Sequence, residues 1–165
     1  MSDVAAATVE TVMAKFPGEV NARAGGPGEA VVTVELAAWP KVARWLATEG
    51  RFTFLSDLCG ADWPHRRPRF DVVVSLLDMR GPRRLRVVVG VEDGSPPTLP
   101  SVTEIWPAAN FFEREAFDMF GIVFSGHPDM TRILMPDEWE GHPLRKDYSI
   151  GKVPVEYKNL SPGRG

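Results

Sequence analysis

The chain has 165 residues, of which 44% are hydrophobic and 25% charged, and its 19 basic and 22 acidic side chains give a net charge of −3. These values are typical of a globular chain with its own core, so they exclude a disordered tail protein and give no overall affinity for nucleic acid or anionic membranes. Of the 30 glycine and proline residues, 19 lie in residues 81–165. We therefore expect less regular structure in the second half.

The N-terminal residues lack the basic-then-apolar pattern of a signal peptide, and no uninterrupted apolar run is long enough to predict a transmembrane helix. Cys59 is the only cysteine, so it cannot build a disulfide framework, a zinc site or an iron–sulfur cluster within this chain. We expect a cytoplasmic location. Any redox role would need electron carriers in other subunits.

Helices and strands are both predicted in the first half of the chain. Apolar periodicity favours helices over residues 2–16 and from Pro40 to Gly50. Alternating or β-branched apolar runs predict strands, with a hairpin connection at 80–84, over residues 30–36, 52–58, 70–79 and 85–91. The fold class expected is α+β: a mixed or antiparallel sheet of about four strands with packed helices, followed by an extended irregular C-terminal segment.

The second half begins with helix signals and then loses periodicity. Ser101 and Glu104 form a capping-box pattern for a short helix, and Asn110 is placed to cap a longer one that ends at Gly121. From Ile122 onward no period is sustained, although large apolar side chains recur. An apolar segment without regular elements must be ordered by lying against something. We therefore predict an α+β domain over residues 1–121 and an extended segment over 122–165 that docks on partner subunits.

Two Gly-His-Pro sequences are the nearest approach to a metal site. His127 and His142, with Asp129 and Asp147, have the nitrogen and oxygen atoms that metal ions bind. Their spacing matches no zinc signature, which favours solvent-facing or capping imidazoles. A stand-alone metal-dependent enzyme that uses His127 and His142 is the alternative from another functional class.

Acidic side chains cluster in the predicted helix before Gly121. Glu113 and Glu115 are two residues apart and point in different directions, so they cannot form the carboxylate pair of a glycosidase-like site. Asp118 is within helical reach of Arg114 and Glu115. The pattern favours a salt-bridged polar face or an ion pair between subunits over acid–base catalysis, and we predict no catalytic residue.

Residues 65–86 are strongly basic. Nucleic-acid binding usually adds interleaved aromatic residues and a positive net charge, which this chain lacks. Two interpretations stay open: a solvated strand edge that discourages sheet pairing, and a surface that docks an acidic partner. The arginines concerned are Arg66, Arg67, Arg69, Arg80, Arg83, Arg84 and Arg86.

Residues 101–106, 109–122 and 126–148 closely resemble the C subunit of bacterial NADH–quinone oxidoreductase, which is the 30 kDa subunit family of respiratory complex I. Glu113-Arg114-Glu115 followed by His127 and Arg132 matches the signature of that family. Residues 54–63 resemble it more loosely. Ser149 stands where the family usually has proline.

The resemblance implies a cofactor-free subunit in the peripheral arm of a proton-translocating enzyme, bound at the cytoplasmic side of the cell inner membrane. It implies packing against the large 49 kDa-type (D) subunit near the quinone-reaction region, with the B and I subunits close by. Flavin, iron–sulfur clusters and quinone would belong to the partner subunits. The equivalent subunit of a related membrane-bound hydrogenase, or of a quinone reductase with another electron donor, is the alternative within this class.

The apolar irregular segment and the family motifs coincide, so we predict that residues 122–165 wrap over neighbouring subunits. Large apolar side chains in desolvated pockets dominate interface energies. The predicted anchors are Phe124, Leu134, Trp139 and Tyr148. The charged residues expected to set the register are Glu113, Arg114, Glu115, Asp118, Arg132, Arg145, Lys146 and Asp147, and His127 and His142 complete the candidate interface.

Overall fold

The computed structural model describes residues 3–149, which form three α-helices, one short 3-10 helix and seven strands. In chain order these are α1 (Asp3–Lys15), β1 (Val20–Ala22), β2 (Val31–Val34), η1 (Leu36–Ala38), α2 (Trp39–Ala47), β3 (Phe54–Asp62), β4 (Phe70–Leu77), β5 (Arg84–Val91), β6 (Thr98–Pro100), α3 (Ala109–Phe120) and β7 (Val123–Ser125). No helix among these has both the length and the apolar character needed to cross a bilayer.

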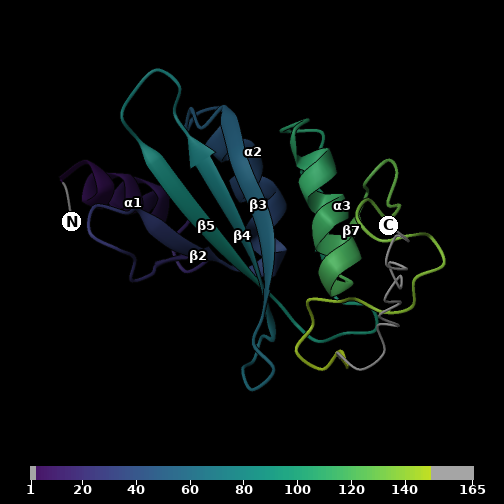
Figure 1. Cartoon of the computed structure of the whole chain (residues 1–165). Helices are drawn as coiled ribbons and strands as arrows, with labels where there is room; N and C mark the ends of the chain where they lie inside the picture. The colour runs from purple at the N-terminus through teal and green to yellow at the C-terminus, as the bar shows by residue number, and fades with distance from the viewer. Residues whose placement is uncertain (1–2, 150–165) are drawn as a thin grey trace, which may run out of the picture.

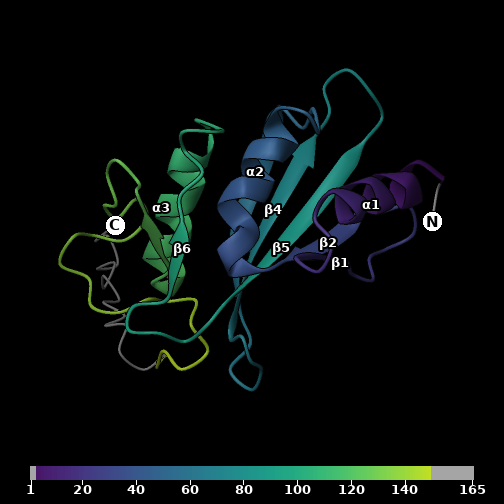
Figure 2. The same cartoon turned by 180° about the vertical axis from the view of Figure 1, so that it is seen from behind.

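Five strands form one mixed sheet in the order β1-β2-β5-β4-β3. β2 and β5 run parallel, and the other neighbours are antiparallel. α1 and α2 lie across one face of this sheet (Figure 2), whereas no helix covers the opposite face of β3, β4 and β5 (Figure 1). The predicted α+β class with a mixed sheet is confirmed, with one strand more than the sequence indicated.

The core lies between the sheet and its helices. Along β4, Phe70, Val72, Val74 and Leu76 alternate onto the covered face and are fully buried, as the period of a strand requires. The same face of β5 contributes buried side chains at alternate positions from Leu85 to Val91. Burying each such side chain stabilises the fold by about 1.5–3 kcal/mol. This cluster is therefore a main source of the stability of the sheet.

The helices have the apolar faces that the sequence predicted. In α2, Trp39, Val42 and Leu46 are fully buried and a proline occupies the first turn, where its missing N–H costs nothing. α3 ends at Gly121, whose backbone is left-handed with φ 73°, as predicted for a glycine C-cap. α3 stands beside β3 (Figure 1), where a Cβ at Gly60 would lie only 2.7 Å from the ring of Phe120.

Two helix signals in the second half are corrected. Residues after Ser101 make turns at 103–105 and 107–108 and no helix, and the Ser101 hydroxyl donates to Glu113 and accepts from the N–H of Thr103. Its carboxylate partner is therefore far along the chain and is not Glu104. α3 begins at Ala109, with no side-chain cap, so the expected capping role of Asn110 is wrong.

The irregular segment begins later than predicted. β7 pairs in parallel with β6, and Ile122 and Phe124 are buried in the core. The sequence showed no period here because a strand of three residues is too short to establish one. The irregular part therefore starts at Gly126, although a division of the chain near this point stays a prediction.

Candidate functional site

The C-terminal strap, defined as residues 126–149, folds back over α3 of its own chain (Figure 1). It contains no helix or strand. Its order must therefore come from side chains that satisfy its backbone. Two anchors do this, one at the C-terminal half of α3 and one at the end of the large sheet.

Asp118 is the first anchor. Its carboxylate is fully buried and accepts hydrogen bonds from the N–H groups of Ile133, Leu134 and Met135 at 3.0, 2.7 and 2.8 Å. It also forms an ion pair with Arg132. Burial alone would raise the pKa of Asp118, but these hydrogen bonds outweigh it and lower the pKa. The aspartate is therefore charged, and it fixes the backbone of the strap at three consecutive residues.

Two arginines extend this anchor. Arg132 donates from one nitrogen to the carbonyl oxygens of Trp139 at 2.8 Å and Gly141 at 3.0 Å. Arg114 donates from α3 to the carbonyl oxygens of Thr131 at 3.2 Å and Arg132 at 3.0 Å. A guanidinium carries five donors in a fixed plane and so holds several carbonyls at once. Together these contacts fix the strap from residue 131 to residue 141.

The two histidines lie at opposite ends of α3. His127 Nδ1 accepts from the N–H of Asp129, and its Nε2 lies 3.2 Å from the carbonyl oxygen of Asn110. His142 Nδ1 lies 3.0 Å from the carbonyl oxygen of Asp118. The two helix positions contacted are eight residues apart, or about 12 Å along the axis.

This separation matters for the metal-enzyme alternative. Each imidazole is engaged with backbone, and within residues 3–149 no group of three or more His, Cys, Asp or Glu side chains is arranged to hold a metal ion. His127 and His142 therefore do not converge on one site. His142 caps a carbonyl in the last turn of α3, whereas His127 lies against a carbonyl near the start of the helix.

Glu113 is buried on another side of α3. Its carboxyl accepts from the Ser101 hydroxyl at 2.7 Å and from the N–H of Val102 at 2.8 Å. Desolvation raises the pKa of Glu113 to about 7, although the two hydrogen bonds oppose this shift. The side chain ties the turn after β6 to α3, so in this chain it has internal partners.

The second anchor is Arg69, at the start of β4. Its side chain is only 7% exposed and pairs with Asp62 at 2.7 Å, Asp93 at 2.9 Å and Asp147 at 3.0 Å. The hydrogen bond from Arg69 lowers the pKa of Asp62, and likewise that of Asp147. Asp147 of the strap therefore joins Asp62 and Asp93 in one ion network around Arg69.

Backbone contacts complete the second anchor. The N–H of Lys146 donates to Asp62 at 2.7 Å, and the N–H of Leu144 donates to the carbonyl of Met119 at 3.0 Å. Arg145 pairs with Asp93 at 3.2 Å and stacks over the ring of Phe70. The strap therefore returns to the main sheet, and its direction is fixed at both ends.

The anchored backbone presents apolar side chains to solvent. Leu134 is 60% exposed and Ile133 37% exposed, even though their N–H groups are bound to Asp118. Leu144 and the α3 residue Phe111 are also exposed. An ordered backbone that holds large apolar groups in water is typical of a protein-binding surface.

The remaining predicted residues fall into different environments. Phe124 is 2% exposed and belongs to the core of this chain. Trp139 and Tyr148 are half-buried, with the Tyr148 hydroxyl 3.4 Å from the carbonyl of Glu140. Glu115 is exposed on α3. Their contact with a partner stays a prediction.

Sequence reasoning did not identify Asp62 or Asp93, and it gave Arg69 only as part of the basic stretch and Ser101 only as a helix cap. Asp62 and Arg69 stand at the ends of apolar runs, seven residues apart, on either side of the β3–β4 connection. Opposite charges at the two ends of a connection between neighbouring apolar runs are a usable signal for a pair. Nothing in the sequence indicates that Asp147 would join them.

The family model described as the 30 Kd subunit of respiratory-chain NADH dehydrogenase matches residues 32–154. A protein of Roseiflexus sp. (strain RS-1), named as the C subunit of NADH-quinone oxidoreductase, is 45% identical, over 92% of this chain and 88% of its own. A protein with the same name from Roseiflexus castenholzii is 53% identical, over 70% of this chain and 67% of its own.

Two solved structures share the fold. The trypsin-resistant fragment (1-134) of Nqo5 is 35% identical, with a TM-score of 0.63 over 75% of this chain and 97% of the fragment. A chain of the membrane-bound sulfane sulfur reductase, an archaeal respiratory membrane complex, has a TM-score of 0.78 over 97% of this chain and 95% of its own. At 23% identity, the second likeness concerns the fold alone.

Proposed function

Because the chain belongs to the family of the 30 kDa subunit of respiratory-chain NADH dehydrogenase, we propose that it is a peripheral-arm subunit of a proton-translocating NADH–quinone oxidoreductase. In this role it binds the 49 kDa-type (D) subunit, close to the B and I subunits, at the cytoplasmic side of the inner membrane. It supports assembly and the quinone-reaction region. Flavin, iron–sulfur clusters and quinone belong to the partners, and this chain supplies no catalytic residue.

One observation carries the proposal: the Asp118 anchor holds Leu134 in an exposed position on an ordered backbone. The three N–H groups of residues 133–135 converge on one buried carboxylate. A loop whose backbone is already ordered loses less conformational entropy when a partner covers it. The buried charges thus hold the strap against its own chain, while Leu134 and its exposed neighbours face the proposed partner.

A second candidate is the equivalent subunit of a related membrane-bound hydrogenase, or of a quinone reductase with another electron donor. The same fold occurs in a chain of a respiratory complex with a different name, and the match covers nearly the whole of both chains. Subunits that co-purify with this chain would separate the two candidates. A flavoprotein of the NADH-oxidising type supports the first, and hydrogenase-type partners support the second.

The strap is tested by Leu134→Asp in the assembled complex. Leu134 is 60% exposed, so the substitution should leave the fold intact, whereas a carboxylate in a desolvated apolar pocket would oppose docking. We expect recovery of the 49 kDa-type subunit with the affinity-tagged chain to fall about tenfold or more. Quantitative mass spectrometry of complexes purified from membranes measures this.

Val4→Asp is the matched control, because Val4 is 45% exposed on α1, away from the strap. It should leave the recovery of the 49 kDa-type subunit unchanged. Equal recovery with Leu134→Asp and Val4→Asp would contradict the docking role of the strap. A thermal melt of each purified chain shows that both variants are folded.

A further inference from the structure

The arginine-rich stretch of the sequence divides into two groups in the fold, and one group has no role in the anchors described above. Arg66 and Arg69 lie at the start of β4 and pair with Asp71 and Asp62. The second group lies beyond the other end of β4, in the β4–β5 hairpin (Figure 1). The stretch therefore does not form one continuous patch.

The hairpin end has a local excess of positive charge. Arg51 and Arg83 pair with Asp78, the backbone N–H of Arg80 donates to the same carboxylate, and Arg84 begins the next strand. Arg80 and Arg84 are exposed and form no ion pair with any residue of 3–149. The chain as a whole has a net charge of −3, so the rest of the chain is net negative and this end is locally positive.

The hairpin is also held in one position. The Asp78 side chain is 1% exposed and accepts from Arg83 at 2.6 Å and from Arg51 at 3.1 Å. The Arg83 hydrogen bond lowers the pKa of Asp78 to about 2. Arg83 also donates to the carbonyl of Gly50 at 2.9 Å and lies over the ring of Phe52. A charged surface on such a support loses little conformational entropy when it binds.

The uncovered face of the sheet adjoins this end. Strand register places Phe54, Leu77 and Arg84 in one row across β3, β4 and β5. Residues directly opposite each other in a ladder share a face. Phe54 is 47% exposed, and Met79, just beyond β4, is 64% exposed. Apolar groups and unpaired guanidinium groups thus alternate over a short distance.

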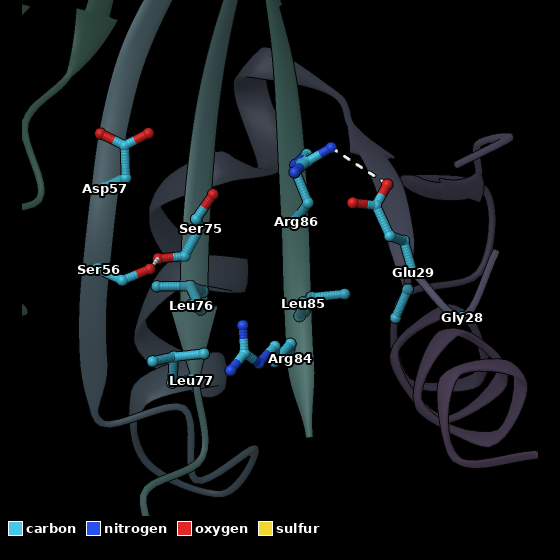
Figure 3. Close-up of a pocket in the computed structure, with 11 residues that line it drawn as sticks. Gly28, Glu29, Ser56, Asp57, Ser75, Leu76, Leu77, Arg84, Leu85 and Arg86 are labelled. Carbon is cyan, nitrogen blue, oxygen red and sulfur yellow. Dashed lines mark hydrogen bonds and ion pairs between the residues drawn. The ribbon is translucent and has the colours of Figure 1, made fainter. Parts of the chain in front are cut away.

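A hollow of about 280 Å³ lies beside this row. Figure 3 shows Arg84 extending from β5 toward Leu77 on β4, and Arg86 directed to Glu29. The Arg86–Glu29 pair at 3.3 Å is solvent-exposed on both sides, and such pairs exchange readily for another carboxylate. No described helix covers this part of the sheet (Figure 1).

We propose that the hairpin end of the uncovered sheet face, formed by Phe54, Leu77, Met79, Arg80 and Arg84, docks an acidic segment of a neighbouring protein. Carboxylates of that segment pair with Arg80 and Arg84, and an apolar side chain covers Phe54 and Leu77. The inference rests on contacts separate from those of the strap, so either docking surface can fail without the other.

The composition of the surface favours a protein partner over an anionic membrane. Its cations are all arginines, whose planar fork matches carboxylates in two parallel hydrogen bonds. Asp57 and Glu29 line the hollow, so the positive charge is confined to Arg80 and Arg84, which suits a few individually placed carboxylates better than a uniformly negative lipid surface. Only Phe54 and Met79 in this group expose much apolar area, which is little for insertion into a bilayer.

The test places the photo-cross-linker benzoylphenylalanine at Met79 in the purified complex. After irradiation, mass spectrometry should identify a peptide of another subunit with several Asp or Glu residues near the cross-linked position. Arg80→Glu combined with Arg84→Glu should reduce the yield of this product about tenfold, and about 0.5 M salt should weaken it as well. Arg44→Glu with Arg67→Glu is the matched control, because both residues are exposed and lie outside the surface.

Three results would overturn the proposal: no product above that of an unirradiated sample, a product peptide without acidic residues, or equal yields from the two double variants. Co-sedimentation with vesicles of phosphatidylglycerol and phosphatidylcholine is measured in parallel. Vesicle binding that is lost only in the Arg80/Arg84 variant would replace the protein partner by a lipid surface. The neutral pair Arg80→Gln and Arg84→Gln, with a melting curve, keeps the test valid if charge reversal disturbs folding.

Discussion

At the scale of single residues, two buried carboxyl groups on α3 have pKa values that are shifted in opposite directions. Asp118 is ringed by backbone N–H groups and an arginine, which lower its pKa. Glu113 accepts hydrogen bonds from only one N–H and one hydroxyl, so desolvation prevails and raises its pKa to about 7. The number of donors decides which state is stable in the core. Both residues were predicted from the sequence as members of a charged surface, and burial could not be read from their spacing.

Glu113 should make the stability of the chain depend on pH near neutrality. Its pKa rises from an ordinary 4.5 to about 7 on folding, so the folded state holds the proton more tightly. Its contribution is therefore complete below about pH 4.5 and is lost as the pH rises through about 7. Between pH 5 and pH 8, we expect Glu113→Gln to gain up to about 3 kcal/mol of unfolding free energy relative to the natural chain.

Urea unfolding of the full chain at both pH values measures this difference. Glutamine fits the site, since its carbonyl can accept from Val102 and its amide can donate to Ser101. The control is Glu115→Gln, an exposed carboxyl two residues along the same helix, which should leave the pH dependence unchanged. Parallel pH profiles for the natural chain and Glu113→Gln would refute the assignment.

At the scale of elements, the C-terminus of α3 connects the domain to the strap. Gly121 ends the helix with φ 73°, and the ring of His142 lies where a Cβ at Gly121 would stand, 2.6 Å away. The glycine therefore serves both the backbone turn and the packing of the strap. Periodicity and the glycine predicted the end of the helix, whereas the contact with a residue 21 positions further along could not be predicted, because it depends on the path of an irregular segment.

Gly121→Ala should cost more stability than the backbone alone explains. A left-handed alanine costs about 1 kcal/mol, and displacing the His142 ring adds about 1–3 kcal/mol. Gly126→Ala is the matched control, since Gly126 has φ 85° and nothing within 4 Å of its Cβ position. Urea unfolding of both variants measures the difference, and equal losses would show that His142 does not pack against Gly121 in solution.

At the scale of the whole molecule, the strap and the hairpin end occupy separate parts of the fold (Figure 1). The strap is held at α3 and at the start of β4, and the basic hairpin follows the end of β4. The two docking surfaces that we propose are therefore separated by the length of β4.

Independence predicts that defects at the two surfaces combine without coupling. When Leu134→Asp is joined with Arg80→Glu and Arg84→Glu, the loss of each partner should stay within a factor of about 2 of its loss in the single-surface variant that affects it. Recovery of each partner is measured by quantitative mass spectrometry from the same membranes. A loss of the 49 kDa-type subunit that Arg80→Glu and Arg84→Glu increase about tenfold further would mean that both surfaces serve one interface.

Local sequence pattern was sufficient to predict the α+β class, the order of the main elements, the helix end at Gly121 and the apolar, irregular character of residues 126–149. These features follow from local periodicity and turn chemistry, which act over a few residues. It did not reveal β1, β6 or β7, because each has only three residues.

The pairing of the charges, in contrast, follows from contacts between segments that are distant in the sequence. Asp118 joins residues 14 to 17 positions away, Arg69 joins Asp147, and the basic stretch is divided by the length of β4. The physical reason is that a buried charge must be paired, and its partner is chosen by the packing of distant segments. The fold therefore determines which charges hold the chain together and which remain exposed for the docking that we propose.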